Sequence, residues 1–287
     1  MLTLLLGFAG AGSLAYLGIC SALLLWQNRL IFLPQEEIKQ TPKDINLGYE
    51  EVWLPVTPAE KIHAWWLPAT VPQADVILYF HGNGCNIGGR VQHIQKFHRL
   101  GFNIFIIDYR GYGRSQGKFP TEKQVYQDAE TAWQYLIQQR GIKPNNILLY
   151  GHSLGGAIAI DLAAKHSEIA GLVIEGSFTS MRQMVNYIGK YQIFPVDWLL
   201  THKFDSMSKI KSLQMPLLFI HGTEDRIVPA HMSQTLYQQA VAPKQLWEVV
   251  GGKHNDIASV SGEEYEQTIS NFYQLVQNHR LNQNLST

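Results

Sequence analysis

The chain begins with one long apolar segment and then alternates between short apolar runs and longer amphipathic stretches. Residues 2–27 carry no charged side chain and are rich in leucine. As a helix, residues 2–26 would extend about 37 Å, enough to cross a hydrocarbon core of ~30 Å with some tilt. Trp26 lies at the far end, where an amphipathic ring suits the membrane interface. This pattern predicts an N-terminal membrane anchor over residues 1–28.

A cleaved signal peptide is the alternative interpretation of this segment. No lysine or arginine precedes the apolar run, and the run exceeds the usual apolar region of a signal peptide, so an uncleaved anchor is favoured. Small residues such as Ser21 and Ala22 leave cleavage open. Arg29 follows the span, and the positive-inside rule therefore favours a location of the main domain on the cytoplasmic side.

The segment after the anchor, residues 29–48, contains Pro34, Pro42 and mixed charge, which predicts a linker or edge segment. Two extended runs follow at residues 49–56 and 61–68. A Thr-Pro turn separates them, so they are predicted to pair as antiparallel strands.

Six short apolar runs without a polar face come next, at residues 75–80, 103–108, 146–150, 171–175, 216–220 and 245–250. Strands of this kind are buried on both faces, as in a parallel sheet covered by helices. Helical patterns lie between or after them, at residues 89–100, 121–140, 153–166, 230–240 and 263–280. The alternation predicts one α/β domain over residues 49–287, with a mostly parallel sheet, antiparallel strands at its start and helices on both faces.

Strict alternation is interrupted over about residues 176–214. This stretch predicts a short cap with two short helices separated by Pro195, too short for a large lid, and hence an open site. Its apolar residues, among them Ile193, Phe194 and Trp198, fit an acyl pocket, a membrane-facing surface or ordinary core equally well.

Charge and cysteine content exclude several classes of function. Lysine plus arginine and aspartate plus glutamate both number 23, so no net charge draws the protein to nucleic acid. The two cysteines, Cys20 and Cys85, lie far apart and form no zinc or disulfide framework. No metal or organic cofactor is implied.

Gly151-His152-Ser153-Leu154-Gly155 stands where a predicted strand gives way to a predicted helix. The G-x-S-x-G pattern in this context indicates a nucleophile elbow, in which a tight turn raises the serine oxygen above the sheet. A structural turn that happens to contain serine is the plainer alternative. The context favours Ser153 as a catalytic nucleophile.

A serine nucleophile needs a base, and the base needs an acid that orients it. In α/β folds with this kind of elbow, the three residues follow one another along the chain in the order serine, acid, histidine. His254 follows the last strand in a glycine-rich turn and is the predicted base. Three other histidines adjoin a glycine at a strand end but come before the acid, and they are interpreted as loop histidines with satisfied hydrogen bonds: His81, His152 and His221.

Asp225 lies five residues beyond the fifth parallel strand and is the predicted acid, with adjacent Glu224 as the alternative. Asp256, two residues after His254, is interpreted as a helix cap or a turn-closing residue.

The tetrahedral intermediate needs two N–H donors. The backbone of Leu154, which follows the nucleophile, is predicted to supply one. The other is expected from Asn83, or alternatively Gly84, in the loop "HGNGCN" after the first parallel strand. A phosphate-binding loop is the competing interpretation of that stretch, but the lysine-serine step is missing.

These residues resemble the α/β-hydrolase superfamily over about residues 50–279. The stretches "WQNRLIFLPQ", "HGNGCN", "FIIDYRGYGRSQG", "GHSLGG", "FTSM", "KFDSMSKI" and "HGTEDRIVP" are, in this order, similar to the membrane-anchored α/β-hydrolase-domain proteins, a group that includes depalmitoylases and lipid hydrolases. The resemblance implies Ser153, Asp225 and His254 as a triad and an esterase or thioesterase activity. Cys85 beside the proposed oxyanion loop departs from many relatives, and the single cysteine of the anchor departs from the cysteine-rich amino terminus of depalmitoylases.

The sequence therefore predicts a membrane-tethered serine hydrolase that cleaves carboxylic esters or thioesters, with acyl or lipid-like substrates. A peptidase or amidase using the same triad is one alternative. A tethered binding protein that kept the fold without catalysis is another, and an active-site probe separates it from an enzyme.

Overall fold

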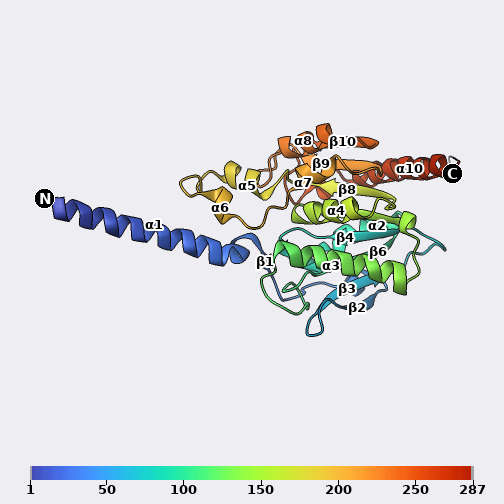
Figure 1. The fold of residues 1–287 in the computed structure, drawn as a ribbon. Helices are drawn as coiled ribbons and strands as arrows, with labels where there is room; N and C mark the ends of the chain where they lie inside the picture. Colours follow the sequence, from blue (N-terminus) through green and yellow to red (C-terminus); the bar gives the residue numbers. More distant parts are fainter. Residues whose placement is uncertain (1, 286–287) are drawn as a thin grey trace.

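Eight strands form the central sheet, in the order β10-β9-β8-β7-β4-β6-β3-β2. The computed structural model describes residues 2–285, and Figure 1 shows helices covering the sheet. Neighbouring strands pair in parallel except that β3 runs antiparallel to both β2 and β6. The strands of this sheet are β2 (Glu50–Pro55), β3 (Lys61–Leu67), β4 (Val76–Phe80), β6 (Asn103–Ile107), β7 (Ile147–His152), β8 (Gly171–Glu175), β9 (Leu217–Gly222) and β10 (Lys244–Val249). The predicted α/β-hydrolase architecture is confirmed.

The helices follow the strands in the predicted alternation. Those of the main domain are α2 (Val91–Arg99), α3 (Glu122–Gln134), α4 (Leu154–Lys165), α8 (His231–Gln239), α9 (Ile257–Val260) and α10 (Glu263–Leu285). The predicted helix over residues 121–140 begins at a capping box between Thr121 and Gln124 and ends in one π-helical turn, Tyr135–Gln139. Between β8 and β9 lie three short helices, α5 (Met181–Ile188), α6 (Val196–Leu199) and α7 (Ser206–Ile210).

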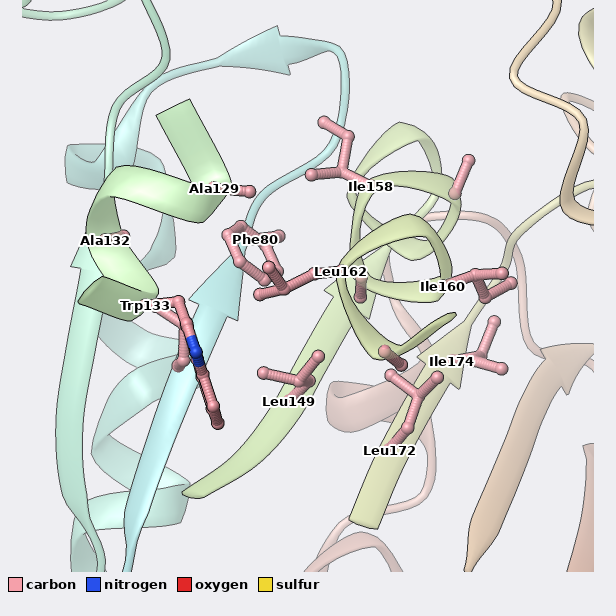
Figure 2. Packing of buried hydrophobic residues seen from close by; sticks show 14 of the residues in the cluster. Phe80, Ala129, Ala132, Trp133, Leu149, Ile158, Ile160, Leu162, Leu172 and Ile174 are labelled. Atoms are coloured by element: carbon pink, nitrogen blue, oxygen red, sulfur yellow. The ribbon is translucent and has the colours of Figure 1, made fainter. Parts of the chain in front are cut away.

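Two apolar clusters, one on each face of the sheet, form the core. Figure 2 shows the first, in which side chains of α3 and α4 meet those of β4, β7 and β8. Residues 154–163 of α4 are all buried, which explains why this helix carries no polar stripe. The second cluster packs α2 and α10 against the other face through side chains such as Phe97 and Phe272.

The last strand differs from the prediction that all six apolar runs are buried on both faces. β10 is the edge strand of the sheet, and of its six residues only Val249 is fully buried. An apolar run alone does not distinguish an edge strand from a central one, because the strand order is decided by crossover connections.

The N-terminal helix α1 (Leu2–Ile31) projects away from the domain, with the short helices α5 and α6 beside its carboxyl half (Figure 1). Its segment Leu6–Ile31 is long and apolar enough to cross a membrane by length and composition, with a mean hydropathy of 1.8. An N-terminal signal sequence meets the same criteria. Directly after α1, β1 (Leu33–Pro34) pairs in parallel with β5 (Gly84–Cys85). The predicted linker thus carries a strand that joins the loop after β4.

Candidate active site

Ser153 stands on the sharp turn between β7 and α4. Its backbone angles are φ 54° and ψ −117°, a region that a residue with a side chain rarely occupies and that marks stored strain. The two flanking glycines make the turn possible. A Cβ on Gly151 would lie 2.3 Å from the carbonyl oxygen of Gly155, and one on Gly155 would lie 2.1 Å from that of Phe80. The predicted elbow is therefore present in the backbone geometry.

The close approach at Gly155 leads to a stability prediction. Gly155→Ala is expected to lower the free energy of unfolding by about 3 kcal/mol, because backbone atoms of β4 cannot move aside for the new methyl group. Gly48→Ala, where a Cβ would meet no atom within 4 Å, is the matched control. Urea unfolding of the detergent-solubilised proteins measures both. A similar loss of unfolding free energy in the two variants would contradict the close packing of α4 on β4.

The structure brings Ser153, His254 and Asp225 together from three strand ends. His254 Nε2 lies 3.0 Å from Ser153 Oγ, and His254 Nδ1 lies 2.6 Å from Asp225 Oδ2. All three side chains are more than nine-tenths buried. This linear arrangement allows the imidazole to take a proton from the serine oxygen while the carboxylate holds the ring in one tautomer.

The environment of Asp225 keeps its carboxylate charged. Burial alone would raise its pKa, but hydrogen bonds from His221 and His254 outweigh burial and hold the pKa well below its usual range. The amides of Ile227 and Val228 also donate to Asp225 Oδ1, at 2.8 and 2.9 Å. The carboxylate is thus prepared to stabilise a protonated His254.

His221 contributes more than the sequence indicated. Its Nε2 lies 2.9 Å from the carbonyl oxygen of Val228 and 3.2 Å from Asp225 Oδ2, while its Nδ1 bonds Ser233. The interpretation as a satisfied loop histidine agrees with these bonds but misses the contact with the acid. Its spacing of four residues from Asp225 was the only signal in the sequence.

The other candidates from the sequence lie around this arrangement without entering it. Glu224 is exposed, whereas its neighbour Asp225 is buried. Asp256 Oδ1 accepts a hydrogen bond from the amide of Lys253 and closes the turn that carries His254. Burial lowers the pKa of His152 well below its usual range, so this neutral ring donates from Nε2 to the carbonyl oxygen of His254 at 2.9 Å.

The loop after β4 borders the same cavity as Ser153. Asn83 and Leu154 both line the cavity that contains Ser153. The Asn83 side chain is occupied elsewhere, since its Oδ1 accepts hydrogen bonds from the Leu33 amide and the Tyr112 hydroxyl, both at 3.0 Å. Cys85 is a free cysteine in a left-handed backbone conformation, with φ 71°. The segment after α1 therefore holds the shape of this loop, a connection that no motif indicated.

The cavity above Ser153 has a volume of about 1030 Å³. Its lining combines the site residues with apolar side chains of the cap (the region α5 to α7) and of α1. Among the described residues that line it, Arg90 and Lys190 are charged, and neither aspartate nor glutamate occurs. A large, mostly apolar cavity with Ser153 in its wall suits the acyl part of a substrate.

Fold and site together define an α/β hydrolase, and comparison with known proteins agrees. A family described as serine aminopeptidase, S33, matches residues 71–209. Protein bem46 of Schizosaccharomyces pombe is 33% identical over 279 residues, which cover 93% of this chain and 92% of bem46. The chain belongs to the α/β-hydrolase superfamily.

Human α/β hydrolase domain-containing protein 17B is 36% identical over 211 residues, covering 72% of this chain and 67% of that protein. Among solved structures, the esterase Pf2001 of Pyrococcus furiosus superposes with a TM-score of 0.71 at 22% identity, covering 84% of this chain and 98% of the esterase. At this identity the esterase supports the fold, and the two relatives support the family.

Proposed function

We propose that this protein is a membrane-tethered serine hydrolase that cleaves carboxylic esters or thioesters with acyl, lipid-like substrates. The observation that carries the proposal is the hydrogen-bonded series Ser153, His254 and Asp225, whose first two members line a large, mostly apolar cavity. An apolar cavity binds the acyl chain, and the series activates the serine oxygen next to it.

The reaction proceeds through an acyl-enzyme. Ser153 Oγ attacks the carbonyl carbon while His254 Nε2 takes its proton, and the amides of Asn83 and Leu154 stabilise the oxyanion. His254 then returns the proton to the leaving alcohol or thiol as the carbon–oxygen or carbon–sulfur bond breaks. Water then attacks the acyl-enzyme while His254 takes its proton, and His254 passes that proton to Ser153 Oγ as the acyl–oxygen bond breaks, which releases the carboxylic acid.

A peptidase is the second candidate, favoured by the description of the matching family. An aminopeptidase must hold the substrate's ammonium group, which a carboxylate does best. The described part of the cavity lining contains cations and no carboxylate. Esters and thioesters therefore suit the cavity better.

Purified protein assayed against esters and thioesters of increasing acyl chain length, with an aminoacyl amide beside them, tests the proposal. We expect turnover of the esters or thioesters and little of the amide. Turnover of the aminoacyl amide alone would replace the proposal by the peptidase function.

The location proposed here rests on α1. As an uncleaved single-pass anchor, α1 would place the catalytic domain on the cytoplasmic side, because Arg29 follows the span. Protease protection of intact membrane vesicles tests the orientation, and sequencing the amino terminus of the untreated protein tests the absence of cleavage.

The pH dependence of the rate follows from the state of Asp225. Because the pKa of Asp225 is held well below its usual range, its carboxylate stays ionised through the mildly acidic range, and protonation of His254 alone removes activity. We expect log(kcat/KM) for a soluble ester to fall on acidification with a slope of about 1. A steeper fall would mean that Asp225 titrates too, and a flat profile with rate-limiting chemistry would contradict a histidine base.

A further inference from the structure

The carboxyl end of α1 forms one wall of the cavity above Ser153. Leu23, Gln27 and Leu30 line the cavity together with side chains of the cap and of the active site. The sequence suggested a tether separate from the catalytic domain. In the structure, the helix supplies part of the surface that would contact a substrate.

Polar contacts hold the end of the helix in this position. Gln27 donates from Nε2 to the carbonyl oxygen of Leu199 at 3.2 Å and accepts at Oε1 from the amide of Thr201 at 2.9 Å. The next residue, Asn28, bonds His202 Nε2 through its Oδ1 at 2.5 Å. The wall is therefore attached to the cap at the last residue of α6 and in the segment between α6 and α7.

A second contact lies much further along the helix. The Tyr16 hydroxyl donates to the carbonyl oxygen of Ile193 at 2.9 Å, and its ring stacks on Phe194 with 5.6 Å between centroids. If Trp26 marks the membrane interface, Tyr16 lies about 15 Å deeper along the helix axis, since each residue adds 1.5 Å. That is about half of a ~30 Å hydrocarbon core. The tip of the cap, by which we mean the segment around Ile193 and Phe194 between α5 and α6, must then lie at hydrocarbon depth.

The exposed side chains of the cap fit this depth. Ile193 is 74% exposed and Trp198 is 88% exposed, and several exposed large apolar side chains within one short region are typical of a membrane or protein contact. Tyr187 and Ile188 of α5 are also exposed. Figure 1 shows α5 and α6 beside α1, reaching outward from the domain along the same direction. The stacking of Tyr16 on Phe194 joins the cap to the helix on this side through aromatic side chains.

We propose that α1 and the cap tip form a membrane-embedded entrance, through which the chain of a bilayer-resident acyl ester or thioester passes into the cavity above Ser153. The proposal rests on the hydrolase function proposed above. It makes α1 part of the acyl-binding site and names the substrate class as long-chain acyl groups that stay in the bilayer. A glycerolipid ester and an S-acylated cysteine share this chemistry.

The first experiment uses the full-length protein in phosphatidylcholine vesicles. The substrates are nitrophenyl palmitate within the bilayer and nitrophenyl butyrate in solution. Ile193→Asp and Trp198→Asp are each expected to lower the rate on the palmitate at least about tenfold, because a charge at hydrocarbon depth opposes insertion of the cap. Neither residue lines the cavity, so the rate on the butyrate should stay within about twofold, a difference under ~0.5 kcal/mol.

Val241→Asp is the matched control. Val241 is β-branched like Ile193 and 69% exposed, but it follows α8, outside the cap and the cavity lining. It should leave both rates unchanged. Equal effects of Val241→Asp and Ile193→Asp, or an unchanged palmitate rate in both cap variants, would overturn the membrane-embedded entrance. So would a change of oligomeric state in Ile193→Asp with an unchanged palmitate rate, since the surface would then be a protein contact.

The second experiment tests whether the end of α1 that lines the cavity contacts the acyl chain, and it uses detergent micelles without a bilayer. Leu23→Trp narrows the cavity and is expected to lower the ratio of kcat/KM for palmitate over butyrate about tenfold, or ~1.4 kcal/mol. Leu17→Trp, on the same helix but 59% exposed and outside the cavity lining, should leave the ratio unchanged. An unchanged ratio in Leu23→Trp would show that α1 does not contact the chain.

Two further substrates in the same vesicles distinguish the sources of the chain. Diacylglycerol and a palmitoyl-cysteine peptide present the same acyl group on different carriers. Hydrolysis of either one supports the entrance and identifies the carrier, and hydrolysis of neither overturns it. If the wild-type protein also fails on nitrophenyl butyrate, the proposed hydrolase function fails instead. Turnover of butyrate by Ser153 with no preference for bilayer chains would refute this inference alone.

Discussion

Replacing Ser153 with alanine is expected to abolish both covalent labelling by a fluorophosphonate and ester turnover, while the protein stays folded. The reason is that Ser153 Oγ is the atom that would form the bond to the probe and to the acyl group, and His254 Nε2 lies 3.0 Å away to take its proton. Gel fluorescence after labelling, and hydrolysis of a soluble ester, measure the two losses.

Ser212→Ala is the matched control for this experiment. Ser212 is exposed in the segment after α7, and its hydroxyl donates to the carbonyl oxygen of Lys209, far in the chain from the candidate site, so labelling and turnover should be retained. Labelling that persists in Ser153→Ala would show that another residue is the nucleophile. Loss of labelling with unchanged turnover would show that the probe and the substrate use different sites.

His254→Ala and Asp225→Asn are each expected to lower kcat by about 10³–10⁴-fold with much smaller effects on KM. The first removes the proposed base. The second removes the charge that stabilises protonated His254 and that fixes its tautomer through the 2.6 Å contact at Nδ1. Both act in the transition state more than in substrate binding, so the loss belongs in kcat.

Two neighbouring carboxylates serve as controls for Asp225→Asn. Glu224→Gln changes an exposed side chain and should have little effect. Asp256→Asn weakens the bond to the Lys253 amide that closes the His254 turn, and we expect a much smaller loss than at Asp225. A larger loss at Asp256 would mean that the acid is wrongly assigned, and a larger loss at Glu224 would support the alternative named from the sequence.

Most of the fold could be predicted because strands buried on both faces and helices with one apolar face have different periodicities. The runs that became β4, β6, β7, β8 and β9 lie within two residues of their predicted bounds. β10 was misjudged as fully buried because exposure at an edge depends on strand order. The cap contains three helices where two were predicted, since short helices are stabilised by packing rather than by their own sequence.

The candidate site could be located because the carboxyl ends of parallel strands meet at one edge of the sheet. Ser153, Asp225 and His254 each follow such a strand, so their loops had to converge once the fold was known. The contact of His221 with Asp225 was missed, because it depends on how one loop folds back over a few residues. The hydrogen bond from the Leu33 amide to Asn83 was missed because it joins residues fifty positions apart, and no local pattern indicates such a contact.

By itself the sequence determined the α/β class, the order of the three candidate catalytic residues and the presence of one long apolar helix, because each of these follows from local patterns of residue type. Only the tertiary structure decided that Ser153 takes a strained turn with His254 within hydrogen-bonding distance, and that α1 and the cap line one cavity with them. Such contacts arise between segments distant in the chain, where the packing of whole side chains, rather than the period of a pattern, sets which groups meet.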